Sequence, residues 1–138
     1  ARLAGYRDTL AKHRLEVDPQ LIVPGDFQES GGLLAVNQLL ASNQRFTALF
    51  AGNDLTAYGA RLALYRRSIR VPDDISIVGF DDLHSSMYTT PPLTTVRQPL
   101  YEVGTNIGRM MLTMLGHEQP GMDMPPLSLI VRESVRRI

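Results

Sequence analysis

The feature that most constrains this chain is an alternation between short apolar runs and longer stretches with helical periodicity. The apolar runs are continuous rather than alternating with polar residues, which is typical of strands buried on both faces. The expected strands are residues 21–23, 48–51, 75–80, 93–96 and 127–131. Helical stretches precede and separate most of them, and this order predicts an α/β fold with a parallel sheet flanked by helices.

The expected helices are recognised by apolar residues that recur every three or four positions. They cover residues 3–14, 33–40, 55–65 and 100–115. Gly116 is well placed to end the last of them, because glycine tolerates the left-handed backbone that terminates many helices. The sequence contains no internal repeat.

Charge and composition exclude several classes of function. The 138 residues hold 14 basic and 14 acidic side chains, so no electrostatic footprint for nucleic acid is expected. The basic run from Arg61 to Arg70 is interpreted as a solvated helix face. The absence of cysteine excludes disulfides and thiolate metal sites. No apolar stretch approaches ~18 residues and no signal peptide opens the chain, so we expect a cytoplasmic protein without a membrane partner.

Catalytic patterns are also missing. His13, His84 and His117 lie far apart without metal-ligand spacing, and no nucleophile elbow or phosphate-binding loop is present. The pair Asp81–Asp82 could suggest a receiver-like or phosphatase-like enzyme, but such a site needs a lysine at a later strand end and Lys12 is the only lysine. We therefore expect no catalytic residue, no metal and no cofactor.

Three expected strands end in a similar way, with a glycine followed by carboxylate or amide side chains. These ends are residues 25–27, 52–54 and 79–82. Ligands of open parallel sheets bind beyond the carboxyl ends of the strands. Amides and carboxylates accept hydrogen bonds from hydroxyls, and an aromatic ring covers an apolar surface, so this set suits a neutral polyhydroxylated or ring-shaped ligand.

Structural roles compete with ligand binding at these positions. Asp54 and Asp82 precede helical stretches, which favours helix caps over ligands. Phe27 is interpreted equally well as a core residue. Asn53 and Asp81 stand one residue earlier, at the strand ends, where either role fits.

Five segments together resemble the lactose/galactose-repressor (LacI/GalR) family of transcription regulators. They are residues 2–6 (RLAGY), 51–60 (AGNDLTAYGA), 71–82 (VPDDISIVGFDD), 91–99 (PPLTTVRQP) and 132–134 (RES). The resemblance implies a fold like that of periplasmic sugar-binding proteins, whose two lobes close on an effector. It also implies a homodimer that reaches operator DNA through a separate N-terminal helix-turn-helix head.

Carried over by position, the resemblance implies that Arg2, Phe27, Asn53 and Asp81 contact the effector. Phe27 would cover the ligand ring, while the other three would exchange hydrogen bonds with its polar atoms. The resemblance also assigns Tyr58, Leu62, Ser85 and Tyr88 to a dimer surface, although ordinary packing explains these four equally well.

The resemblance further implies a division of the chain. Residues 1–90 would form the C-terminal lobe, 91–120 a hinge strand and a helix that packs on an N-terminal lobe, and 121–138 a return strand and tail. The methionine-rich face of residues 103–114 would then lack a partner, which predicts exchange between chains or packing on another polypeptide. Where the family usually places glycine, this chain has Ser68, so a serine in a left-handed turn is expected.

The leading hypothesis is a sensor of a sugar or glycoside in a transcriptional repressor. A purine or nucleoside is the alternative effector, because Phe27 could stack on a flat base. A periplasmic sugar-binding protein of a transporter is the rival from another class.

Overall fold

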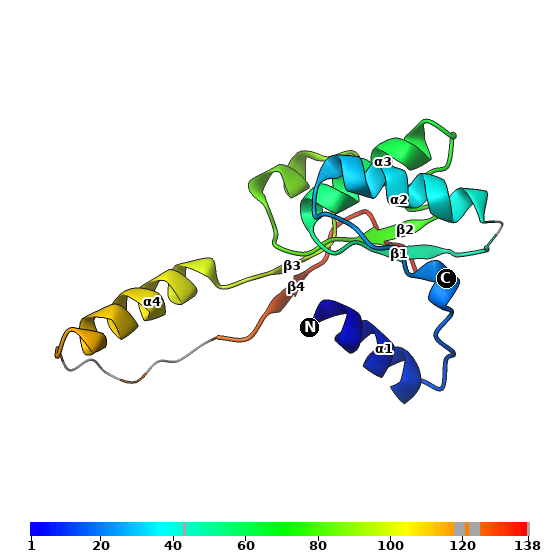
Figure 1. The fold of residues 1–138 in the computed structure, drawn as a ribbon. Coiled ribbons are helices and arrows are strands. Elements are labelled where there is room, and N and C mark those ends of the chain that lie inside the picture. The colour runs from blue at the N-terminus through cyan, green and yellow to red at the C-terminus, as the bar shows by residue number, and fades with distance from the viewer. Residues whose placement is uncertain (43, 118–120, 122–124, 138) are drawn as a thin grey trace.

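The computed structural model describes residues 1–42, 44–117, 121 and 125–137. Its helices are α1 (Arg2–Lys12), α2 (Glu29–Ala41), α3 (Asp54–Tyr65) and α4 (Leu100–Met114), with short 3₁₀ helices η1 (Pro19–Leu21) and η2 (His84–Tyr88). Its strands are β1 (Ala48–Phe50), β2 (Ser76–Val78), β3 (Thr95–Arg97) and β4 (Ser128–Ile130). Figure 1 shows a packed body, formed by α2, α3, β1 and β2, from which α4 projects.

The expected parallel sheet is confirmed in the body. Strand β1 pairs with β2 in parallel, with Leu49 opposite Ile77. The chain around β3 continues this arrangement, because parallel bridges join Val78 to Thr94 and Asp81 to Arg97. Strand β4 then pairs with β3 in the antiparallel direction. The carboxyl ends of β1 and β2 therefore lie beside β3.

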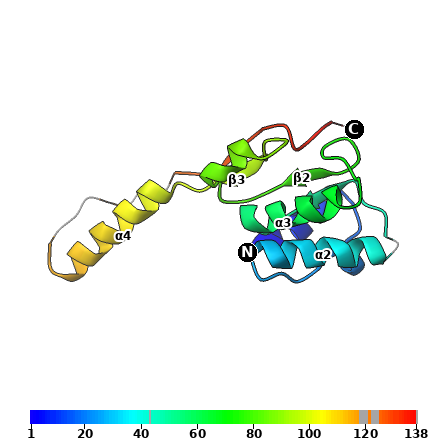
Figure 2. The same cartoon turned by 90° about the horizontal axis from the view of Figure 1, so that it is seen from above.

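Helices α2 and α3 cover the sheet and pack closely against each other (Figure 2). Two glycines permit this approach: a Cβ at Gly32 would collide with the carbonyl of Thr56, and one at Gly59 with that of Glu29. The core beneath them consists of completely buried residues such as Leu64, Ile77 and Leu93.

Two helix ends behave as the sequence predicts. Ser68 has a φ of 58°, and the amides of Ser68 and Ile69 donate to the carbonyls of Tyr65 and Leu64. This is the left-handed turn in which glycine is preferred. Gly116 ends α4 with a φ of 86°, which glycine adopts without a steric penalty because it has no Cβ.

The arm consists of β3, α4 and β4, and its helix leaves the body (Figures 1 and 2). Many apolar side chains of α4 are exposed, namely Leu100, Tyr101, Ile107, Met110, Met111, Leu112 and Met114, and so is Leu115 directly after it. The arm starts inside the core, because Leu93, Thr94 and Thr95 are buried. The domain division at residue 91 stays a prediction, but the change from buried to exposed side chains comes nearer Arg97.

Three predictions from the sequence are wrong. Residues 21–23 form no strand: Pro19–Leu21 is a 3₁₀ helix, and Ile22 is extended without a paired neighbour among the described strands. An apolar tripeptide becomes a strand only where another strand offers hydrogen bonds. Asp54 and Asp82 are not helix caps. Asn53 caps α3 by accepting from the amide of Thr56, so Asp54 is free for other contacts. The N-cap of η2 is Leu83, without a side-chain cap bond, so Asp82 caps no helix either.

Candidate functional site

The first turn of α1 reaches the carboxyl ends of the sheet through Arg2. Its guanidinium donates to the carbonyl of Gly52 and forms an ion pair with Asp81 at 3.5 Å. It also lies on the ring of Phe80, 3.9 Å from the ring centroid, and 5.8 Å from that of Phe27. Cation–π contact and ion pairing hold this side chain in place at a half-exposed position.

Phe27 and Asn53 meet at the same place. The amide nitrogen Nδ2 of Asn53 donates to the carbonyl of Phe27 at 2.9 Å, while Oδ1 accepts from Thr56. A Cβ at Gly52 would lie 3.1 Å from the Phe27 ring, so glycine permits the ring to approach β1. The ring itself is 54% exposed, so Phe27 is not a core residue. It offers an aromatic face to solvent beside charged groups.

Asp81 supplies the acceptor of the site. Its Oδ1 accepts from Nε2 of Gln98 at 2.5 Å and from Arg2, whereas in the described part of the chain Oδ2 has no hydrogen-bond partner. The backbone is strained here, because φ is 116° at Asp81 and 63° at Phe27. Such conformations cost about 1–3 kcal/mol each and gather at functional sites.

The structure thus brings together Arg2, Phe27, Asn53 and Asp81, which come from four separate segments. The resulting set contains a guanidinium, a free carboxylate oxygen and an exposed ring, the groups that bind a ring-shaped molecule bearing hydroxyls. Both polar atoms of Asn53 are already used within the protein, so its direct contact with a ligand stays a prediction.

Asp82 ties the body to both strands of the arm. Its carboxylate accepts from Arg97 of β3 and from Arg132 beyond β4, both at 2.6 Å. Burial raises the pKa of the Asp82 carboxyl, but the hydrogen bonds from Arg132 and Arg97 outweigh it and hold the pKa below 3.8. Arg132 also donates to the carbonyl of Leu93. Ser134 adds a second tie by donating to the carbonyl of Ile77.

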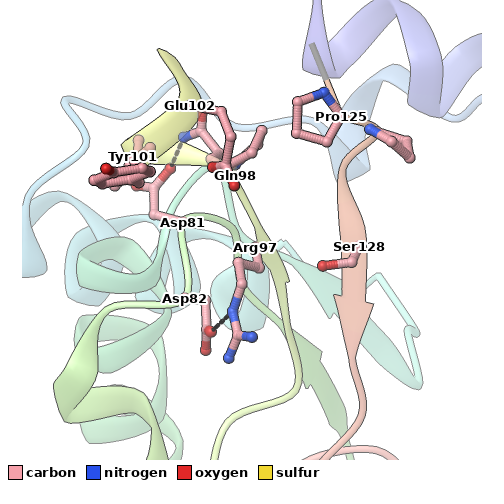
Figure 3. Close-up of a pocket in the computed structure, with 11 residues that line it drawn as sticks. Asp81, Asp82, Arg97, Gln98, Tyr101, Glu102, Pro125 and Ser128 are labelled. Atoms are coloured by element: carbon pink, nitrogen blue, oxygen red, sulfur yellow. Dashed lines mark hydrogen bonds and ion pairs between the residues drawn. The ribbon is translucent and has the colours of Figure 1, made fainter. Parts of the chain in front are cut away.

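A hollow of about 500 Å³ opens between the two strands of the arm and the first turn of α4. Figure 3 shows Asp81, Gln98, Tyr101 and Glu102 along its wall, with Pro125 opposite. Arg2, Phe27 and Asn53 do not line this hollow. Of the four residues predicted to contact the effector, only Asp81 lines it.

The residues predicted for a dimer surface differ in their surroundings. Tyr88 is 70% exposed, and Leu62 and Ser85 are also exposed. Tyr58 instead shares a hydrogen bond of 2.7 Å with Ser86, and burial raises the pKa of its hydroxyl. A groove of about 310 Å³ runs beside Tyr58 and Leu62 between α2 and α3. A dimer contact through these residues stays a prediction.

Reasoning from the sequence missed two contributors to the site. Phe80 supports the Arg2 guanidinium and Gln98 donates to Asp81. Phe80 directly precedes Asp81, so its position at a strand end was a usable signal. Gln98 lies in the segment 91–99, but its contact depends on the pairing of Asp81 with Arg97, which no spacing in the sequence reveals.

Within the described residues, neither a metal-binding cluster nor a membrane-spanning helix is found. No group of three or more histidine, aspartate or glutamate side chains there is placed to share a metal ion. None of the helices described combines the length and apolarity needed to span a bilayer.

Comparison with known proteins matches nearly the whole chain. A family described as a periplasmic binding protein-like domain matches residues 1–135. The HTH-type transcriptional repressor PurR of Haemophilus influenzae (strain PittEE) is 35% identical, with 99% of this chain and 42% of the repressor covered. The HTH-type transcriptional repressor CytR of Escherichia coli (strain K12) is 38% identical, with 99% and 41% covered. The chain thus spans about two fifths of these relatives.

Solved structures agree in fold. A sugar-binding transcriptional regulator of the LacI family from Escherichia coli, complexed with phosphate, has a TM-score of 0.91 at 37% identity. The match covers 97% of this chain and 49% of the regulator's chain. A transcriptional regulator CelR–cellobiose complex has a TM-score of 0.88 at 33% identity, covering 96% and 41%.

Proposed function

The chain belongs to the periplasmic binding protein-like domain family, in the form found in LacI-family transcriptional regulators, and from this premise we propose that it senses a small-molecule effector for a DNA-binding repressor. The observation that carries the proposal is the convergence of Arg2, Phe27 and Asp81 beyond the ends of β1 and β2. This is the edge at which open parallel sheets bind ligands.

The preferred effector is a sugar or glycoside. The free Oδ2 of Asp81 accepts from a sugar hydroxyl, Arg2 donates to ring or hydroxyl oxygens, and the Phe27 ring covers the apolar face of the sugar. The CelR–cellobiose complex supports this class.

A purine or nucleoside is the second candidate. The exposed ring of Phe27 beside a charged pair also suits stacking on a base, and relatives include the repressors PurR and CytR. In either case the repressor would act as a cytoplasmic homodimer, would reach DNA through a separate helix-turn-helix head and would catalyse no reaction.

Calorimetric titration tests the proposal and separates the two ligand classes. The probes are cellobiose and methyl β-galactoside on one side, and hypoxanthine and adenosine on the other. We expect a sugar to release heat and Asp81→Ala to weaken its binding at least about tenfold, the effect of removing a charged acceptor. Asp74→Ala is the control and should leave binding unchanged, because Asp74 is an exposed carboxylate that precedes β2, whereas Asp81 follows that strand.

Heat from a purine alone would select the second candidate. The absence of heat from both classes, or an equal loss in both variants, would contradict the proposed site.

A further inference from the structure

Asp54 is a completely buried carboxylate that the effector site does not use directly. Its Oδ1 accepts from the hydroxyl of Thr95 at 2.5 Å. Its Oδ2 accepts from the amide of Leu83 at 2.8 Å and from the hydroxyl of Ser86 at 2.6 Å. Among the described residues it forms no ion pair, so three uncharged donors hold it.

These donors belong to different parts of the molecule. Thr95 is the first residue of β3, through which the chain leaves the body, whereas Leu83 and Ser86 belong to the segment around η2. The amide of Asp54 donates to the carbonyl of Phe80, next to Asp81. The preceding residue, Asn53, holds the loop of Phe27. The carboxylate of Asp54 therefore joins the arm to the segment around η2, while the backbone amide of the same residue joins it to the effector site.

The hydrogen bonds continue to the surface of α3. Ser86 donates to Asp54, so its oxygen accepts from the hydroxyl of Tyr58 at 2.7 Å. Thr95, Asp54, Ser86 and Tyr58 thus form one connected chain of hydrogen bonds. The packing around it is tight, because a Cβ at Gly79 would collide with Oδ1 of Asp54.

A buried charge without a cation is costly, and an apolar side chain of similar size would avoid that cost. The carboxylate, unlike an apolar side chain, fixes the relative orientation of the groups that donate to it. Its two oxygens are fixed in one plane, so the bond from Thr95 at Oδ1 sets where Oδ2 faces η2. If β3 moves, Oδ1 is released, the carboxylate turns, and Oδ2 loses its alignment with Leu83 and Ser86.

We propose that Asp54 is a positioning residue that couples movement of β3 to the position of η2 and Tyr58. The inference rests on the proposed function. If effector binding moves β3, Asp54 would transmit that movement to η2, the segment predicted to contact a second copy. Coupling of this kind requires a packed element whose arrangement both sites bias.

Hydrogen exchange of the intact protein, followed amide by amide, tests the coupling without an effector. Thr95→Val keeps the shape and removes the hydroxyl, which donates to Asp54 and also accepts from the Asp82 amide at 3.4 Å. Exchange at the Leu83 amide is expected to accelerate about tenfold relative to the core amides, the size of one hydrogen bond to a charged group. Thr95→Ser restores the hydroxyl and should restore the protection.

Thr94→Val is the matched control, because Thr94 is a buried neighbour whose hydroxyl accepts from the Arg132 amide and, among the described residues, makes no hydrogen bond to Asp54. Selective acceleration at Leu83 in Thr95→Val alone supports the coupling. The same change in both variants, or equal acceleration of all core amides, overturns it. If Thr95→Val does not fold, Ser86→Ala is used, with the Tyr58 ring signals and the Leu83 amide as readouts, and unchanged Leu83 protection overturns the coupling.

The two proposals fail in different measurements. Absence of calorimetric heat contradicts the effector site, whereas unselective exchange at Leu83 contradicts the coupling.

Discussion

Helices α3 and α4 have similar lengths and apolar content but opposite surroundings. Helix α3 buries Ala57, Ala60, Ala63 and Leu64 against the sheet and α2. Helix α4 exposes most of its apolar residues, and Met114 is 81% exposed. The difference teaches that periodicity specifies which face of a helix is apolar, while burial depends on whether a second surface is present.

The first prediction concerns what covers the exposed apolar face of α4. An exposed apolar face of this size is a site of association. We expect the protein to self-associate through α4 or to require another polypeptide, as the sequence predicts. Size-exclusion chromatography with light scattering measures this, and a stable, well-folded monomer would contradict it.

A second prediction concerns single apolar residues in the two helices. Leu64→Ala should lower the free energy of unfolding by about 2–5 kcal/mol, because it leaves a cavity in the core. Met110→Ala in α4 removes a half-exposed side chain and should cost less than about 1 kcal/mol. Urea denaturation compares them. Equal costs would mean that α4 is packed as tightly as α3.

A third prediction addresses the junction between body and arm. Asp82→Ala leaves Arg132 without its carboxylate and should lower stability by about 2 kcal/mol. Because the pKa of Asp82 lies below 3.8 in the folded protein, this contribution is present above pH 3.8 and is lost as the pH falls through the lower value. Denaturation of wild type and variant should therefore converge at acidic pH. A difference that does not shrink as the pH is lowered would refute the ion-pair explanation.

The turn after α3 offers a smaller, stabilising change. Ser68→Gly should raise the free energy of unfolding by about 1 kcal/mol, since glycine adopts a φ near 58° without a steric penalty. Ser68→Ala keeps the Cβ and serves as the control. Thermal denaturation decides, and an equal melting temperature for the glycine and alanine variants would argue against backbone strain.

The smallest expected effect lies at an exposed pair. A hydrogen bond from Arg70 lowers the pKa of Asp74 to about 2. The stabilisation is thus present above pH 3.8 and is lost as the pH falls through about 2. NMR titration of the Asp74 carboxyl should show its pKa return toward 3.8 in Arg70→Gln, and an unchanged pKa would exclude this partner.

The sequence predicted what local signals determine. Helices α2 and α3 and strands β1 and β2 follow from periodicity and apolar runs, whereas the left-handed Ser68 was expected from the family resemblance. Residues 21–23 failed because strand formation depends on a partner that periodicity does not reveal.

The candidate site was likewise predicted in part. Strand ends identified Phe27, Asn53 and Asp81 as candidates, and the family resemblance added Arg2. The cap at Asn53, the buried Asp54 and the tie from Asp82 to Arg132 arise from contacts between residues far apart in the chain. Residue type alone could not assign these roles.

The most direct test of the effector site is an amide NMR titration with the ligand that calorimetry identifies. We predict that the largest shift changes cluster at Arg2, Phe27, Asn53 and Asp81. Changes confined to Tyr101 and Glu102 in the hollow, or to the groove beside Leu62, would contradict the account.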